Sequence, residues 1–156
     1  MRRTHRISAG AIVLEQGKVL LGRYRERDGR TALLAPGGGV HMRESLPEAA
    51  IREVREETGL EVNPYPCRIL FVEELLSQKY RHIKIWLLCS LVGGELALTQ
   101  EAKKEGIIEV GWYNKGELAS EVVYPSLLKT TDWQAFLDNT WESRYLELKE
   151  VDFPPV

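Results

Sequence analysis

Glutamates collect on one face of a predicted helix, and this feature constrains the local structure more than any other in the chain. Ser45 is a suitable N-cap and Gly59 is a suitable residue to end a helix, so the sequence predicts a helix that runs to about Thr58. Positions three and four apart share a helix face, which brings together the carboxylates of Glu53, Glu56 and Glu57. Like charges at this spacing cost about a few tenths of a kcal/mol per pair, and anions near the C-terminal end oppose the helix dipole. A helix selected for stability alone would not carry this pattern.

A hard divalent cation would remove the repulsion. Mg²⁺ prefers oxygen ligands, and proteins commonly hold it between one or two carboxylates and the phosphates of a substrate. Arg52 precedes Glu56 by four residues and can hold that carboxylate in place. The alternative is a solvated charged face, in which Arg52 and Arg55 partly balance the glutamates. The helix by itself leaves both interpretations open.

A glycine-rich segment precedes this helix at a defined distance. Residues 36–39 read Pro-Gly-Gly-Gly, a loop in which the backbone can approach a ligand closely. After Gly38, five residues lead to Glu44 and seven more lead to Arg52, from which the chain reads Arg-Glu-Val-Arg-Glu-Glu-Thr-Gly-Leu to Leu60. This stretch resembles the Nudix box, G-x5-E-x7-R-E-U-x-E-E-x-G-U with U an apolar residue, and it meets every position of that motif.

The resemblance implies an α/β fold, the Nudix-type α/β/α sandwich with a mixed central β-sheet. Members of the family typically hydrolyse a nucleoside diphosphate linked to another moiety X, with Mg²⁺ or Mn²⁺ as cofactor. Their metal ligands are the glutamates that match Glu53, Glu56 and Glu57. The arginine that matches Arg52 orients these ligands, and the glutamate that matches Glu44 supports the site.

Hydrolysis of a pyrophosphate also needs a group that accepts a proton from the attacking water. Glu53 is one candidate, and Glu101 and Glu105 are rivals in a polar stretch, Thr99–Gly106, because many Nudix members recruit the base from a later loop. A carboxylate that already ligates a metal is a weaker base, which favours the loop. The predicted catalytic set is therefore Arg52, Glu53, Glu56, Glu57, Glu101 and Glu105.

The expected substrate contacts are Arg23, Gly38, Gly39 and Glu44. Arg23 is the strongest candidate among the arginines near the second strand, which could clamp phosphates bidentately or form a solvated loop with the acidic residues between them. The tags that mark dinucleoside polyphosphate, ADP-ribose, NADH and coenzyme A members of the family are missing from their usual places. The sequence thus indicates which bond is cleaved and leaves X open: a nucleotide sugar such as ADP-ribose, or a nucleoside triphosphate.

Apolar periodicity predicts the remaining elements. A hairpin is expected with a turn at residues 16–17, followed by further strands and a second helix over residues 125–139. The predicted strands cover Ile7–Leu14, Lys18–Tyr24, Ala32–Ala35, Cys67–Leu76, Ile83–Val92, Ile107–Tyr113 and Arg144–Val151.

Composition narrows the class of protein. A length of 156 residues suits a single domain, here a Nudix hydrolase domain over residues 1–156. With 21 basic and 23 acidic residues, the chain lacks the basic excess of a dedicated nucleic-acid binder, so a small nucleotide-type substrate is the expected partner and stable nucleic-acid binding is not. The longest uncharged apolar stretch, Ile85–Val92, is far short of the ~20 residues that span a membrane. Two distant cysteines, Cys67 and Cys89, are expected to be reduced thiols of a cytoplasmic protein. A homodimer is compatible with the sequence.

A second interpretation of the function is a non-catalytic Nudix-like domain that binds nucleotides for regulation. Such domains usually lose the metal-binding glutamates. All three are present here, at positions 53, 56 and 57, which favours the enzyme.

Overall fold

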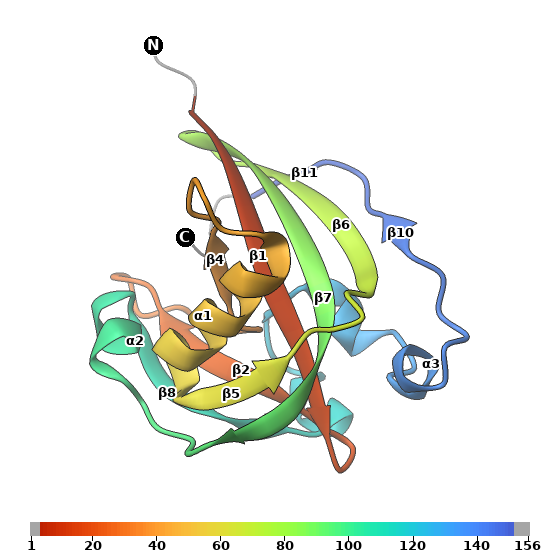
Figure 1. Ribbon diagram of the computed structural model, residues 1–156. Helices are drawn as coiled ribbons and strands as arrows, with labels where there is room; N and C mark the ends of the chain where they lie inside the picture. The colour runs from red at the N-terminus through yellow and green to blue at the C-terminus, as the bar shows by residue number, and fades with distance from the viewer. Residues whose placement is uncertain (1–3, 152–156) are drawn as a thin grey trace.

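Two long strands, β1 (Thr4–Glu15) and β7 (Tyr80–Gly94), run parallel through the centre of the computed structural model, which describes residues 4–151 (Figure 1). Every residue from Ser8 to Val13 is buried, as expected for a strand covered on both faces. The other strands extend and curl this mixed sheet, in the order β10-β6-β7-β1-β2-β3-β9, with β4, β5, β8 and β11 paired off this path. Their bounds are β2 (Lys18–Arg25), β3 (Thr31–Leu34), β4 (Gly37–Gly39), β5 (Leu60–Asn63), β6 (Ile69–Leu76), β8 (Ile107–Tyr113), β9 (Val123–Tyr124), β10 (Arg144–Tyr145) and β11 (Lys149–Glu150).

The predicted hairpin is confirmed. β1 and β2 pair antiparallel, with Glu15 opposite Lys18. The two residues between them, Gln16 and Gly17, have φ of 50° and 76°, which is the backbone twist that a two-residue hairpin turn requires.

The predicted first helix is also confirmed, as α1 (Leu46–Thr58) on one face of the sheet (Figure 1). The Ser45 hydroxyl accepts a hydrogen bond from the Glu48 backbone N–H, and Gly59, at φ 77°, ends the helix. Ala50 and Val54 bury its apolar stripe in a cluster with residues of β1, β2 and β7. This packing fixes which side of the helix faces the sheet and which side carries the glutamates.

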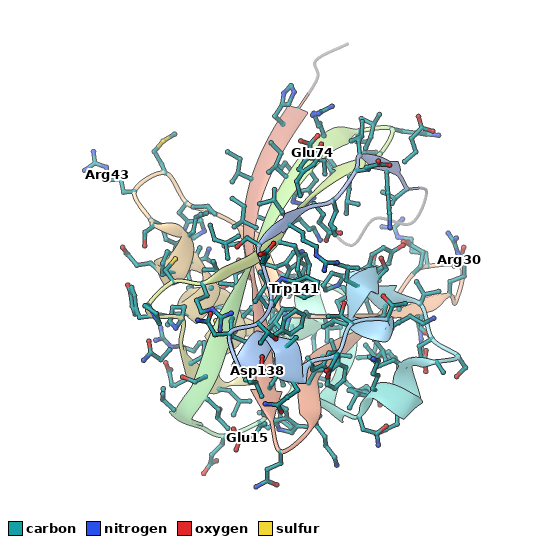
Figure 2. The ribbon with its side chains drawn as sticks, turned by 90° about the vertical axis from the view of Figure 1, so that its right-hand side faces the viewer. Glu15, Arg30, Arg43, Glu74, Asp138 and Trp141 are labelled. Atoms are coloured by element: carbon teal, nitrogen blue, oxygen red, sulfur yellow. The ribbon has the colours of Figure 1, made fainter. Side chains whose placement is uncertain are left out.

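The opposite face carries a larger apolar cluster, which includes Phe71, Trp86 and Phe136. Short helical turns cover it: η1 (Lys115–Leu118), η2 (Ser126–Lys129) and α3 (Gln134–Leu137). The Trp141 indole N–H also lies on this side and donates to the Leu70 carbonyl at 2.8 Å (Figure 2).

The prediction of one long helix over residues 125–139 is wrong. The first helical turn, η2, ends at Lys129. The Trp133 indole N–H then donates to the Leu128 carbonyl at 2.9 Å, and in a continuous helix a backbone N–H would donate to this carbonyl. The Asp132 carboxylate then accepts from the Gln134 N–H and starts α3. Burial of the Trp133 ring thus competes with helical periodicity and prevails.

Two other predicted segments differ from the structure. The single strand expected over Arg144–Val151 is reduced to β10 and β11, two short parallel pairings along β6. The polar stretch Thr99–Gly106, expected as a loop, contains the short helix α2 (Gln100–Lys104). Within residues 4–151, no helix has the length and apolar character needed to cross a membrane. Both cysteines are free thiols, as expected.

Candidate active site

The glycine strand β4 lies between β1 and α1 because it has no side chains. It pairs antiparallel with β1, with Gly38 opposite Ala9. A Cβ atom on Gly37 would fall 2.7 Å from the Gly10 Cα, and one on Gly38 would fall 2.5 Å from a carboxylate oxygen of Glu53. The Gly37 N–H donates to the Glu57 carboxylate at 3.1 Å. The backbone thus approaches the glutamates of α1 directly.

Arg52 fixes the carboxylates around it. Its guanidinium grips Glu44 with two hydrogen bonds, of 2.7 and 2.9 Å, and donates to Glu53 at 2.8 Å and Glu56 at 3.1 Å. It also donates to the carbonyl of Gly39 at 2.9 Å. The Arg52 guanidinium holds the pKa of Glu44 at about 2, against an ordinary 4.5. The planar fork of an arginine suits this pattern of several fixed acceptors.

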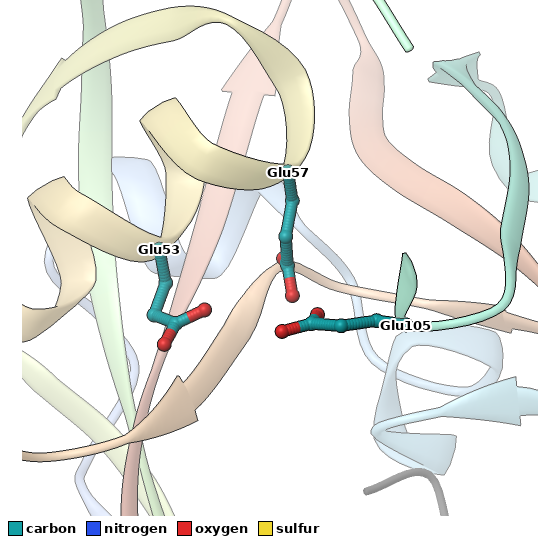
Figure 3. A group of neighbouring side chains, drawn as sticks. All are labelled: Glu53, Glu57 and Glu105. Atoms are coloured by element: carbon teal, nitrogen blue, oxygen red, sulfur yellow. The ribbon is translucent and has the colours of Figure 1, made fainter. Parts of the chain in front are cut away.

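Three carboxylates converge at the end of α1. Oxygen atoms of Glu53, Glu57 and Glu105 lie within 4.8 Å of one another (Figure 3). Glu53 and Glu57 are only 6% and 7% exposed. Glu105 is exposed by comparison. Desolvation, strongest for Glu57, raises the pKa of all three groups above the ordinary value, and the charges of neighbouring glutamates raise it further. We call these three residues the carboxylate cluster.

Helix α2 delivers Glu105 to this cluster. The Thr99 hydroxyl accepts from the Ala102 N–H and donates to the backbone carbonyl of Glu56, so it caps α2 and fastens it to α1. Gly106, at φ 89°, then turns the chain into β8. Glu101 lies in the first turn of α2, where it is exposed and outside the carboxylate cluster.

Two cavities meet at Glu105. The first, which we call the polar cleft, has a volume of about 530 Å³ and is lined by His5, Arg6, Ile7, Gly39, Val40, His41, Arg52, Glu53, Glu56 and Glu105. The second, which we call the apolar pocket, is narrower, at about 50 Å³. Its walls include Tyr24, Leu34, Trp86, Ile107, Val110 and Tyr124, with Glu57, Glu105, Ser8 and Lys84 as polar members.

A comparison with known families decides the relationship. The model of the NUDIX domain matches residues 4–134, most of the chain. The chain belongs to the Nudix hydrolase family.

Individual Nudix proteins resemble the chain at low identity. The 8-oxo-dGDP phosphatase NUDT18 of Mus musculus is 33% identical over 104 residues, which are 67% of this chain and 30% of that protein. The ADP-ribose pyrophosphatase of Methanocaldococcus jannaschii is 26% identical over 98 residues, 63% of this chain and 58% of that protein. The matched part of the chain thus spans less than two thirds of either relative. Among solved structures, the MutT protein from Methanosarcina mazei Go1 superposes with a TM-score of 0.66 and 26% identity, over 91% of this chain and 99% of that one.

The Nudix glutamates fit a divalent metal ion. The cluster offers only carboxylate oxygens, the ligands that Mg²⁺ and Mn²⁺ prefer. Glu53 and Glu57 are buried with like charges as neighbours, so a cation would relieve the repulsion that raises their pKa. Glu56, the third predicted ligand, lines the polar cleft beside Arg52 and is outside the cluster, so its role as a ligand stays a prediction.

Arg23 lies outside the carboxylate cluster and outside both cavities. Its guanidinium makes two hydrogen bonds to Glu121, at 3.0 and 3.1 Å, and one to Glu109 at 2.8 Å, and these carboxylates raise its pKa. Arg23 was expected to bind substrate phosphates, but in the structure it forms ion pairs with Glu109 and Glu121. The arginines that line the polar cleft are Arg6 and Arg52.

Two polar residues of β7, His82 and Lys84, are buried where the sequence pattern predicts the opposite. In β7, Ile83 and Ile85 alternate with His82 and Lys84, so a period of two would bury the isoleucines. The structure buries His82 and Lys84 instead, at 4% and 8% exposure. His82 lies 2.5 Å from the Ser8 hydroxyl, and burial lowers its pKa to about 4. Burial likewise lowers the pKa of Lys84, against the attraction of nearby carboxylates.

Proposed function

We propose that this chain is a metal-dependent pyrophosphohydrolase that cleaves the diphosphate bond of a nucleoside diphosphate linked to a moiety X. The observation that carries the proposal is the convergence of Glu53, Glu57 and Glu105 where the polar cleft meets the apolar pocket. A substrate with a charged diphosphate and a flat, weakly polar nucleoside base matches this pair of cavities.

Glu53 and Glu57, with Glu56 from the side of the polar cleft, would hold Mg²⁺ or Mn²⁺. A bound divalent ion would offset the negative charge of the diphosphate and lower the pKa of a ligated water. Arg52 keeps two of these glutamates in place through its hydrogen bonds. Arg6 and Arg52 supply positive charge in the cleft that would take the phosphates.

Glu105 is the base that the geometry favours. It reaches the cluster from a separate element, whereas Glu101 on the same helix lies outside it. Glu53 already accepts a hydrogen bond from Arg52 and would ligate the metal, which weakens it as a base. Burial raises the pKa of Glu105 above the ordinary value, toward the range in which a carboxylate accepts protons well near neutral pH.

The names of the relatives suggest two kinds of substrate to assay first: an oxidised guanine nucleoside diphosphate and ADP-ribose. Nucleoside triphosphates complete the panel. Each compound is incubated with Mg²⁺, with Mn²⁺ and with a chelator, and the products are separated by chromatography. We expect a nucleoside monophosphate and phosphorylated X, formed only with metal and lost in Glu57→Gln.

The same panel addresses the alternative, a non-catalytic regulatory domain. Saturable nucleotide binding with no hydrolysis of any compound under either metal would contradict the enzyme and support that alternative. A hydrolysis rate that Glu57→Gln leaves unchanged would instead indicate a contaminating activity.

A further inference from the structure

Among the described residues, 4–151, Lys84 is the one cationic side chain that lines the apolar pocket. It lies in β7, opposite Glu73 of β6 and beside Ser8 of β1 in the sheet register. Its residue is 8% exposed, and its ammonium nitrogen lies 5.8 Å from the centre of the Trp86 ring. A long, charged side chain is thus held inside the sheet face that borders the carboxylate cluster.

The Lys84 ammonium has donors to spare. Within residues 4–151 it takes part in no hydrogen bond and has no carboxylate oxygen within 4.0 Å; it lies over the Trp86 ring and is attracted by the more distant charges of Glu73 and Glu57. Nearby acceptors are engaged with other groups: Glu73 accepts from the Trp86 indole at 2.8 Å, and Glu57 accepts from the Gly37 N–H at 3.1 Å. The ammonium is not a buried atom without a partner, so water reaches it from the pocket. It has three N–H donors, and a ligand that displaces this water has to supply a hydrogen-bond acceptor in its place. The pocket is therefore built to receive a hydrogen-bond acceptor.

The walls of the pocket indicate what kind of group carries this acceptor. They are mainly ring and aliphatic side chains, and Gly10 makes room for one of them, because a Cβ there would collide with the Trp86 ring. A flat heterocyclic base matches such walls, whereas a phosphate would meet a single cation with Glu57 and Glu105 at its side. Arg6, whose guanidinium suits a phosphate, lines the polar cleft and not this pocket.

We propose that Lys84 determines base specificity by donating a hydrogen bond to a ring carbonyl oxygen of the substrate's base. The inference rests on the proposed function and narrows it to substrates whose base carries a keto group, such as guanine, hypoxanthine or uracil. Adenine presents an amino group where guanine and hypoxanthine present the carbonyl at position 6. Two donors would then face each other, and the ammonium would lose its acceptor.

Inosine and adenosine triphosphates form a matched pair of probes, because hypoxanthine and adenine differ only at position 6 and the adjacent ring nitrogen. The wild-type protein should hydrolyse inosine triphosphate with a kcat/KM at least about tenfold higher than that for adenosine triphosphate, near the low end of the roughly 10- to 150-fold that one hydrogen bond to a charged group supplies. In Lys84→Met, which removes the ammonium but keeps a long, unbranched apolar side chain, the ratio should fall to within threefold, through a loss on the inosine compound. Lys79→Met, at an exposed site in the turn before β7, should keep the wild-type ratio.

Equilibrium binding of inosine and adenosine monophosphates supplies a second measurement, because neither contains an anhydride. The wild type should bind the inosine compound more tightly, and Lys84→Met should bind both alike. A wild-type protein that treats the two bases equally, in turnover or in binding, overturns the proposal without recourse to any variant. A preference that persists in a folded Lys84→Met does the same. Failure of the proposed function would appear differently, as binding selectivity without hydrolysis of either triphosphate.

Discussion

A methyl group on Gly38 would lie 2.5 Å from the nearest carboxylate oxygen of Glu53. The glycine strand β4 therefore packs its backbone directly against a predicted metal ligand. The φ of Gly38 is not in the left-handed region, so space and not backbone conformation demands the glycine. The site depends on this close approach as much as on the charged residues.

Gly38→Ala should displace the Glu53 carboxylate. Because displacements of about 1 Å can cost roughly 10²-fold in rate, we expect kcat to fall by about ten- to a hundredfold and the Mg²⁺ requirement to rise. The measurement is kcat against Mg²⁺ concentration, with circular dichroism to confirm folding. Gly93→Ala is the matched control, since a Cβ there meets no atom within 4 Å. Equal kinetics of the two variants would contradict the steric role of Gly38.

Glu105→Gln and Glu101→Gln test which glutamate is the general base. Glu101 lies in the first turn of α2, and Glu105 is the residue that ends this helix. Loss of a general base typically costs 10²–10⁴-fold, so we expect about that loss of kcat in Glu105→Gln and a change of less than about twofold in Glu101→Gln. A general base acts in its deprotonated form, and the pKa of Glu105 is raised above 4.5. As the pH is lowered, the wild-type rate should therefore begin to fall at a pH above 4.5. Glu105→Gln should lose this acidic limb. If it keeps the limb and the wild-type kcat, Glu53 becomes the leading candidate.

Arg52→Lys should fail to replace the arginine although the charge is kept. Arg52 has acceptors on Glu44, Glu53 and Glu56 at once, and an ammonium on a flexible stem cannot match that fork. We expect kcat/KM to fall by about tenfold or more, with a higher Mg²⁺ concentration for half-maximal rate. Arg55→Lys serves as the control on the same helix, because within residues 4–151 Arg55 forms its ion pair with Glu61, outside the carboxylate cluster. Full activity of Arg52→Lys at unchanged Mg²⁺ dependence would show that charge alone suffices.

Glu57→Gln should raise the thermal stability of the metal-free protein while it abolishes turnover. The pKa of Glu57 is raised well above 4.5 by burial and by neighbouring carboxylates, so folding favours its protonated form. Ionisation of Glu57 therefore destabilises the fold most above the raised pKa, and this penalty declines as the pH falls from that pKa toward the ordinary value of 4.5. The melting temperature of Glu57→Gln should exceed that of the wild type most at high pH.

Metal should reverse that order. A ligand at 100 times its Kd stabilises by about 2.7 kcal/mol, or roughly 5–11 °C for a chain of this size. Mg²⁺ should raise the melting temperature of the wild type by an amount in this range and leave Glu57→Gln nearly unchanged. A shift that is equal in the two proteins would place the metal elsewhere.

The sequence alone determined the parts of the site that depend on local spacing. Helical periodicity put Glu53, Glu56 and Glu57 on the same side of one helix, and Ser45 and Gly59 marked its ends within a residue of the observed bounds. Backbone hydrogen bonds four residues apart and capping side chains set these features, and both are encoded within a few residues.

Tertiary structure decided the features that depend on residues far apart in the chain. It brought Glu105, and not Glu101, into the carboxylate cluster by fastening α2 to α1 through Thr99. It withdrew Arg23 into ion pairs with Glu109 and Glu121, and it broke the helix expected around Trp133. It also turned Lys84 inward, because the register of β7 between β1 and β6 sets which alternate residues face the pocket. The face of a strand that is buried depends on the neighbours it meets in the assembled sheet, and for β7 these neighbours overrode the local alternation of isoleucines.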